Sequence, residues 1–277
     1  MLKGTALYEM YSLVGYWYKT LSKKTENQVI TKYCFGSDSK QYFILYDPIE
    51  VDPSKPLIVY YHGGGWLFGN PELFAKKAAI FNKLGYQIII PCYRKIPRYT
   101  YTDMREDLNL TLSKIQALNK EGILNFDKII LGGTSAGGTL ASLIYYQKEY
   151  LAAYGFKQED FSGLFLTAPP LDLTKMTSSP VLYFFAGRRS SKKFRDASPL
   201  NWLKDAKPIK TLCIHGTKDG LVNYEASESF FNDFENIHPT FLKKIKLAEY
   251  GHIESASWAH TNNFLRDEIL NFIKSCH

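Results

Sequence analysis

The sequence predicts an α/β protein with one mostly parallel central sheet that helices cover on both faces. Short apolar runs alternate with segments of helical periodicity, which is the order that strand–helix–strand units produce. The inner runs, such as residues 87–90 and 163–166, are almost continuously apolar, as strands buried on both faces are. The chain has 277 residues, 45% of them hydrophobic, and we expect a single domain with a large core, residues 1–277.

The elements are expected in a regular order along the chain. Two edge strands come first, at about residues 28–35 and 41–46, and strands and helices then alternate to the C-terminus. The further strands expected are residues 56–61, 87–90, 128–131, 163–166, 209–215 and 243–249. Residues 1–25 carry apolar side chains at helical spacing, interrupted by Glu9. We expect an N-terminal helix near the functional site, with a simple packing helix as the alternative.

Residues 132–138 (GGTSAGG) are the most informative stretch of the chain. They lie between a β-branched apolar run, residues 128–131, and a helical segment, residues 139–148. A serine at the tip of such a strand-to-helix turn is strained and leaves room only for glycine neighbours. The helix N-terminus that follows directs N–H groups and a positive dipole end toward a developing oxyanion. We therefore expect Ser135 to be a nucleophile; a glycine-rich turn without chemistry is the alternative.

Three successive glycines follow an apolar run at residues 62–66 (HGGGW). They let the backbone turn sharply and leave N–H groups with no side chain beside them, as an oxyanion hole requires. The expected donors are the N–H groups of Gly64, Gly65 and Ala136. His62 is expected to brace this loop rather than act as a base, and a flexible hinge is the alternative for the whole segment.

An acid and a base are expected farther along the chain, in that order. Asp219 lies in a glycine-flanked turn after residues 209–215, at the carboxyl end of a strand, where ligand sites of open α/β sheets collect. Asp172, past the preceding strand, is the alternative acid. His252 lies just past the last strand, residues 243–249, and is the expected base. A structural role is expected for the remaining histidines: His215, His238, His260 and His277.

Taken together, these segments resemble the α/β-hydrolase fold, and more narrowly the esterases similar to hormone-sensitive lipase and the bacterial acetyl esterases. The resemblance covers about residues 40–275, with further support from residues 93–97 and from Asp107. Two departures stand out. Thr134 stands where much of that family has Asp, and residues 216–219 are closer to the related feruloyl-esterase and prolyl-peptidase-like branches.

The resemblance implies a small lid in the insertion at residues 171–205, which in related hydrolases helps to form the substrate pocket. Aromatic side chains of the insertion and of the glycine loop are the candidates for substrate contact, and core packing is the alternative role for each. They are Trp66, Tyr183, Phe184, Phe185 and Trp202. A short lid and many aromatic residues favour a compact pocket, and hence short acyl chains such as acetyl to butyryl.

Composition narrows the class of protein further. The formal net charge of +7 is partly concentrated in residues 187–195, but no nucleic-acid-binding motif accompanies it, and a solvated loop is expected there. The four cysteines form no metal-binding cluster, so we expect a reducing compartment and a cytoplasmic location. No uncharged apolar run approaches 18 residues, and a signal peptide is not expected.

The function expected from these parts is that of a serine carboxylesterase, with Ser135, His252 and Asp219 as its triad. Neither a metal nor an organic cofactor is expected, and the expected partner is a small-molecule ester substrate; a homodimer is left open. A peptidase or amidase using the same triad is the first alternative, although it usually has a propeller-like companion domain. A non-catalytic binding protein is the second, although such proteins usually lack one triad member.

Overall fold

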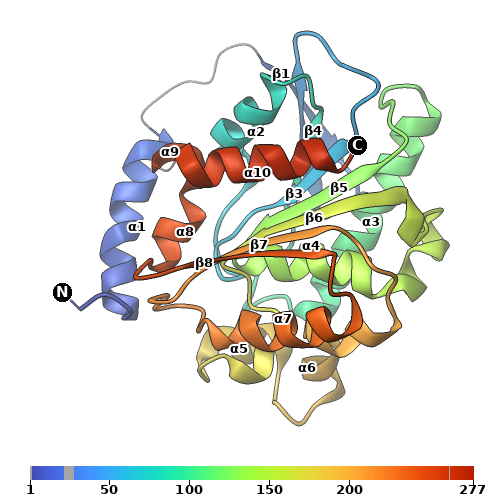
Figure 1. Ribbon diagram of the computed structural model, residues 1–277. Coiled ribbons are helices and arrows are strands. Elements are labelled where there is room, and N and C mark those ends of the chain that lie inside the picture. The colour runs from blue at the N-terminus through green and yellow to red at the C-terminus, as the bar shows by residue number, and fades with distance from the viewer. Residues whose placement is uncertain (1, 22–27, 262) are drawn as a thin grey trace.

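The computed structural model describes residues 2–21, 28–261 and 263–277, and its centre is an eight-stranded sheet (Figure 1). The strand order is β1-β2-β4-β3-β5-β6-β7-β8. β1 pairs antiparallel with β2 and β2 with β4, and every pair from β4 to β8 is parallel. The strands are β1 (Gln28–Cys34), β2 (Tyr42–Pro48), β3 (Leu57–Tyr61), β4 (Ile88–Pro91), β5 (Ile129–Thr134), β6 (Phe161–Thr167), β7 (Thr211–Gly216) and β8 (Leu242–Leu247). The predicted fold class, a mostly parallel sheet covered on both faces, is confirmed.

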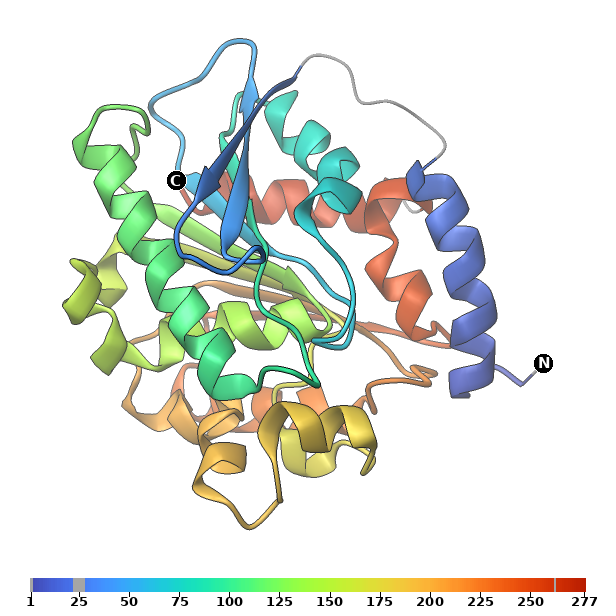
Figure 2. The same cartoon turned by 180° about the vertical axis from the view of Figure 1, so that it is seen from behind.

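Helices cover both faces of this sheet, as Figures 1 and 2 show from opposite sides. One face carries α2 (Ala75–Asn82) and α10 (Asn263–Ser275), and the other carries α3 (Tyr101–Lys120), α4 (Ala136–Tyr146) and α7 (Glu225–Ile237). The remaining helices are α1 (Ala6–Leu21), α5 (Pro180–Ala186), α6 (Lys192–Asp196), α8 (His252–Ala256) and α9 (Trp258–Thr261).

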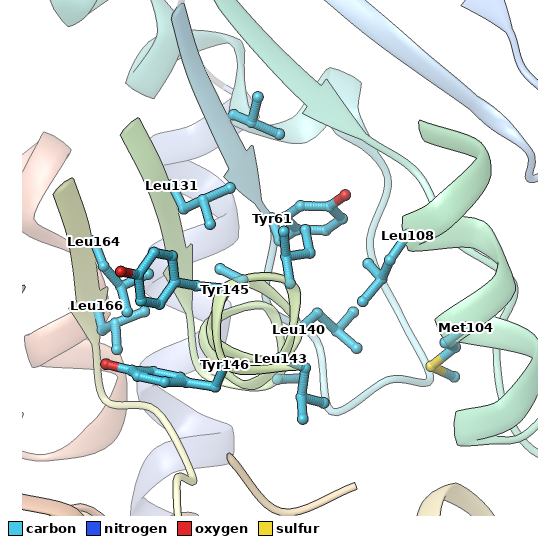
Figure 3. Packing of buried hydrophobic residues seen from close by; sticks show 14 of the residues in the cluster. Tyr61, Met104, Leu108, Leu131, Leu140, Leu143, Tyr145, Tyr146, Leu164 and Leu166 are labelled. Atoms are coloured by element: carbon cyan, nitrogen blue, oxygen red, sulfur yellow. The ribbon is translucent and has the colours of Figure 1, made fainter. Parts of the chain in front are cut away.

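The side chains of each inner strand alternate between two buried clusters, which is the period of a β-strand. In β3, Val59 and Tyr61 join the cluster beneath α3 and α4, whereas Ile58 and Tyr60 join the cluster beneath α2 and α10. Figure 3 shows the first cluster, in which leucines of β5 and β6 pack against Leu140 and Leu143 of α4 and others. Because both faces are buried, the inner strands are mostly apolar.

The insertion between β6 and β7 folds into short helical turns that pack against α4 and α7. Two of its helices begin at serine caps: the side chain of Ser179 accepts from the N–H of Leu182, and that of Ser191 accepts from Phe194. Within the described residues, the insertion adds no strand to the sheet.

The end of the N-terminal segment, residues 22–25, falls outside the described residues. Within the described ranges, no helix is both long enough and apolar enough to span a bilayer.

Candidate active site

Ser135 is the residue between β5 and α4, and its backbone is held in an unusual conformation. Its φ of 53° and ψ of −127° lie in a region that residues with a side chain rarely adopt. The N–H of Ser135 donates to the carbonyl of Thr167, at the end of the neighbouring strand β6 (2.8 Å). A Cβ at Gly137 would overlap the carbonyl oxygens of Tyr61 and His62. Glycine at 137 therefore lets the first turn of α4 approach the end of β3.

The structure brings Ser135, His252 and Asp219 together from the ends of three strands. Nε2 of His252 lies 2.9 Å from Oγ of Ser135, and its Nδ1 lies 2.6 Å from Oδ2 of Asp219. All three side chains are buried. A carboxylate only accepts, so the proton of the neutral imidazole resides on Nδ1. Nε2 is then free to accept the proton of the serine hydroxyl.

The carboxylate of Asp219 is held by four donors. Oδ1 accepts from the backbone N–H groups of Leu221 (2.9 Å) and Val222 (2.7 Å). Oδ2 accepts from His252 and from Nε2 of His215 (3.0 Å). Burial alone raises the pKa of Asp219, but the interactions with His252 and His215 outweigh it and lower the pKa below its usual value. Asp219 is thus an anion around neutral pH.

The pKa of His252 is shifted in the opposite direction, above its usual value. Burial lowers this pKa, but the charge of Asp219 and its hydrogen bond raise it, and the charge of Glu9 adds to the increase. The site therefore favours the protonated imidazole that forms when His252 takes a proton.

The glycine loop lies beside Ser135, and its backbone adopts conformations that favour glycine. Gly64 has a φ of +131° and Gly65 a φ of +60°, and a Cβ at Gly64 would overlap the carbonyl of Phe68. A Cβ at Gly63 would lie 3.4 Å from Cβ of Ser135. In the described part of the chain, the N–H groups of Gly64, Gly65 and Ala136 donate no hydrogen bond. These three donors are free to bind a ligand.

His62 braces this loop, as its position directly before the glycines predicts. Its Nδ1 donates to the carbonyl of Gly63 (2.8 Å), and its ring stacks between those of Phe74 and Tyr93. Burial and the nearby charge of Lys95 hold the pKa of His62 well below its usual value, so the ring is neutral.

The alternative acid, Asp172, is used in a local turn. Its Oδ1 accepts from the N–H (2.9 Å) and the hydroxyl (2.6 Å) of Thr174. Asp172 thus caps the 3₁₀ turn Leu173–Lys175. The structure brings Asp219, rather than Asp172, to His252.

The candidate substrate-contacting aromatics differ in exposure. Trp66 and Phe185 are buried and stack face to face, with centroids 3.9 Å apart. Trp202 is half-buried and donates to the carbonyl of Asp196 (2.9 Å). Phe184 and its neighbour Tyr183 on α5 are exposed. Of these candidates, the two exposed rings of α5 are the ones open to solvent, and hence to a ligand.

Sequence reasoning missed three residues that contribute to the site. His215, for which the sequence predicts a structural role, contacts Asp219; its position at the end of β7, four residues before Asp219, is the signal that indicates this contact. Glu9, which in the sequence only interrupts an apolar stretch, accepts a hydrogen bond from the backbone N–H of His252.

The third missed residue is Lys77 of α2, which is fully buried behind the nucleophile. Its Nζ donates to the hydroxyls of Tyr60 (2.9 Å) and Thr134 (3.2 Å) and to the carbonyl of Ala256 (3.0 Å). Burial lowers the pKa of Lys77 to about 7. Thr134, the position that departs from the resembled family, is thus part of a buried polar network, and no spacing in the sequence indicates it.

No group of three or more His, Cys, Asp or Glu side chains within the described ranges is arranged to hold a metal ion. In the same ranges the four cysteines are free thiols, of which Cys34 is exposed and Cys92, Cys213 and Cys276 are buried.

The chain belongs to the BD-FAE family, whose model matches residues 44–234. An Arabidopsis thaliana protein named probable isoprenylcysteine alpha-carbonyl methylesterase ICMEL2 is 24% identical over 296 residues, covering 97% of this chain and 65% of that protein. The chain thus spans about two thirds of the length of this relative. A Mycobacterium tuberculosis protein named probable carboxylic ester hydrolase LipM is 25% identical, covering 77% of this chain and 53% of that protein.

Solved structures show the same fold. Esterase B from Lactobacillus Rhamnosis superposes with a TM-score of 0.78 at 18% identity, covering 98% of this chain and 93% of that one. A bacterial heroin esterase superposes with a TM-score of 0.73 at 18% identity, covering 97% and 90%. The resemblance to α/β-hydrolase esterases that the sequence motifs predict is confirmed.

Proposed function

We propose that this protein is a carboxylic ester hydrolase in which Ser135 is the nucleophile, His252 the general base and acid, and Asp219 the residue that orients the imidazole. The observation that carries the proposal is the continuous chain of hydrogen bonds from Ser135 through His252 to Asp219. Beside it lie three backbone N–H groups that have no partner among the described residues. The names of the relatives, which include methylesterase and carboxylic ester hydrolase, support the same reaction class.

Acylation follows from the geometry. Oγ of Ser135 attacks the ester carbonyl carbon while Nε2 of His252 takes its proton. Asp219 stays ionised and stabilises the imidazolium. The carbonyl oxygen becomes an oxyanion and accepts hydrogen bonds from the N–H groups of Gly64, Gly65 and Ala136. The bond from carbon to the alkoxy oxygen then breaks, and His252 gives its proton to the leaving alcohol.

Deacylation reverses these roles. His252 takes a proton from a water molecule whose oxygen attacks the acyl carbon, and the same N–H groups hold the second oxyanion. The bond between the acyl carbon and Oγ breaks, His252 returns the proton to Ser135, and a carboxylic acid leaves. The raised pKa of His252 suits this cycle because the imidazolium must be accessible near neutral pH.

We propose short acyl esters, acetyl to butyryl, as the preferred substrates, with residues 171–205 as a small lid over the site. Two observations support a compact pocket. Ser135 itself is 9% exposed, and the insertion forms only short helical turns, of which α5 stacks Phe185 on Trp66 of the glycine loop. The exposed rings of Tyr183 and Phe184 on α5 are the proposed contacts of the lid with substrate.

The test is a panel of p-nitrophenyl esters from acetyl to palmitoyl, assayed beside an aminoacyl p-nitroanilide with the Ser135→Ala variant as the background. We expect the highest kcat/KM for acetyl to butyryl, a steep decline at longer chains, and little or no anilide cleavage. Preference for the anilide would replace the proposal by a peptidase or amidase. Absence of Ser135-dependent turnover on every substrate would leave only the binding-protein alternative.

A further inference from the structure

The N-terminal helix α1 presents apolar side chains to solvent and a carboxylate to the protein. Five apolar side chains of this helix are more than half exposed: Leu7, Met10, Tyr11, Val14 and Tyr18. Glu9, in contrast, is completely buried, and Tyr16 is the other buried residue among the α1 side chains that the structure describes. A helix that docks for hydrophobic stability alone buries its apolar stripe. The burial of Glu9 therefore has another basis.

The carboxylate of Glu9 joins two turns that are far apart in the sequence. Oε1 accepts from the N–H of His252 (2.6 Å) and from the N–H of Gly220 (3.3 Å), the residue after Asp219. Oε2 accepts from the N–H of Ile253 (3.0 Å). One side chain from α1 thus links the turn that carries the acid to the turn that carries the base.

The two turns are shaped to receive α1. A Cβ at Gly251 would overlap Oε1 of Glu9, and a Cβ at Gly220 would lie 2.5 Å from the backbone carbon of Thr5. Any larger residue at either position would push the helix, and the carboxylate with it, away from the site. The turns on both sides of the contact thus leave space for the carboxylate.

We propose that Glu9 is a positioning residue that holds Asp219 and His252 at their reactive separation and places a negative charge beside the imidazole. The inference rests on the ester hydrolase function proposed above. Glu9 touches neither Ser135 nor the oxyanion donors, so its effect on catalysis passes through the two turns that it ties together.

The electrostatic part follows from the groups around His252. Asp219 contacts its Nδ1, Ser135 contacts its Nε2, and His215 acts through Asp219. Glu254 accepts from the N–H of Gly251 (2.7 Å) and is paired with Lys3 (2.8 Å). Burial lowers the pKa of His252, but Asp219 and then Glu9 raise it above its usual value. Removing the charge of Glu9 therefore lowers this pKa.

The test compares Glu9→Gln with Tyr8→Phe. Glutamine has the same length, but its uncharged amide presents N–H donors to backbone N–H groups and breaks at least one contact. Tyr8 is the matched control, because its hydroxyl lies in the same helix and donates to Glu254 on the same turn (3.4 Å). Both variants must melt near the wild-type temperature.

For Glu9→Gln we expect kcat to fall roughly tenfold to a hundredfold, as misplacement of a catalytic group does, with KM within about twofold of the wild type. The acid limb of the kcat/KM profile should move to lower pH by roughly half a unit. Tyr8→Phe should change none of these. Glu9→Asp, which keeps the charge but shortens the side chain, should lose kcat while the acid limb stays in place.

An NMR titration of the His252 ring in the same variants needs no substrate. It therefore tests the role of Glu9 separately from the proposed ester hydrolase function. A wild-type chain without ester turnover overturns the proposed function, and the titration then decides the inference alone. An unchanged His252 pKa in Glu9→Gln, or equal losses in Glu9→Gln and Tyr8→Phe, overturns the role of Glu9 and reduces it to helix docking. Should Glu9→Gln not fold, Glu9→Asp carries the kcat test by itself.

Discussion

His215 lies at hydrogen-bond distance from Asp219, with Nε2 3.0 Å from the same carboxylate oxygen that contacts His252. Nε2 of His215 also faces the carbonyl of Val222 (3.1 Å), so it sits between two acceptors and carries a proton. The ring is fixed from its other side by the hydroxyl of Ser227 (2.8 Å). The orientation of Asp219 therefore depends on a second histidine.

We predict that His215→Leu lowers kcat about tenfold and destabilises the fold by about 1–3 kcal/mol, because a buried carboxylate loses a donor. His215→Gln, whose amide N–H can reach the same oxygen, should retain more of both. Steady-state kinetics and urea unfolding of the two variants check this. Equal activity in His215→Leu and the wild type would show that the contact does not orient Asp219.

Ser135→Ala should abolish ester turnover and labelling by a serine-directed phosphonate, because it removes the one serine hydroxyl that contacts His252 in the described chain. Ser142→Ala is the matched control. Ser142 lies on α4, the helix that follows Ser135, and its hydroxyl donates to the carbonyl of Gly138 (2.8 Å). Intact-mass spectrometry after labelling measures both. A phosphonate adduct in Ser135→Ala would refute the nucleophile.

Asp219→Asn should lower kcat by several orders of magnitude, on the scale of ~10⁴, because the amide no longer holds the Nδ1–H tautomer of His252. Asp172→Asn should leave kcat near the wild-type value, since Asp172 only caps a 3₁₀ turn. Both variants replace a carboxylate by an amide, and the two residues follow neighbouring strands, β6 and β7. A large loss in Asp172→Asn without one in Asp219→Asn would reverse the assignment of the acid.

Gly64→Ala should reduce kcat more than it raises KM. Its Cβ would overlap the carbonyl of Phe68 at a φ of +131°, so the loop must shift and misdirect at least one N–H group. Loss of one oxyanion donor costs about 3 kcal/mol, on the order of a hundredfold in rate. The variant must keep a near-wild-type melting temperature. An unchanged kcat in a well-folded variant would mean that the loop does not hold the oxyanion.

Lys77 predicts a pH dependence of stability. Its pKa is lowered from 10.5 to about 7 by burial, so between these values the unfolded chain binds more protons than the folded one. Stability therefore rises with pH across this window and is independent of this group below it. From pH 7 to pH 9 the increase should be roughly 2 to 3 kcal/mol. In Lys77→Met this increase should disappear, as urea unfolding at the two pH values would show; an equal increase in both proteins would contradict it.

The elements of the sheet and the two glycine-containing turns could be predicted from local stretches of sequence. Short β-branched apolar runs bounded by turn residues are typical of strands buried on both faces, so they predict the covered sheet locally. Ser135 could be predicted because a strand-to-helix turn with a strained tip requires glycines at 133 and 137. Both glycines lie within two residues of Ser135, so the pattern is visible in the sequence. His252, in the turn that follows the last strand, could be predicted in the same way.

The residues that surround His252 could not be predicted in this way, because distant segments bring them together. Asp172 and Asp219 both follow parallel strands. The glycine-flanked turn favours Asp219 as the acid, but its contact with His252 requires the order β6-β7-β8, which places the end of β7 beside the turn that begins α8. Glu9 lies 243 residues from its partner His252, and Lys77 lies 57 residues from Thr134. Such contacts arise when distant segments pack, and their energy comes from burial and hydrogen-bond geometry that no short stretch of sequence contains.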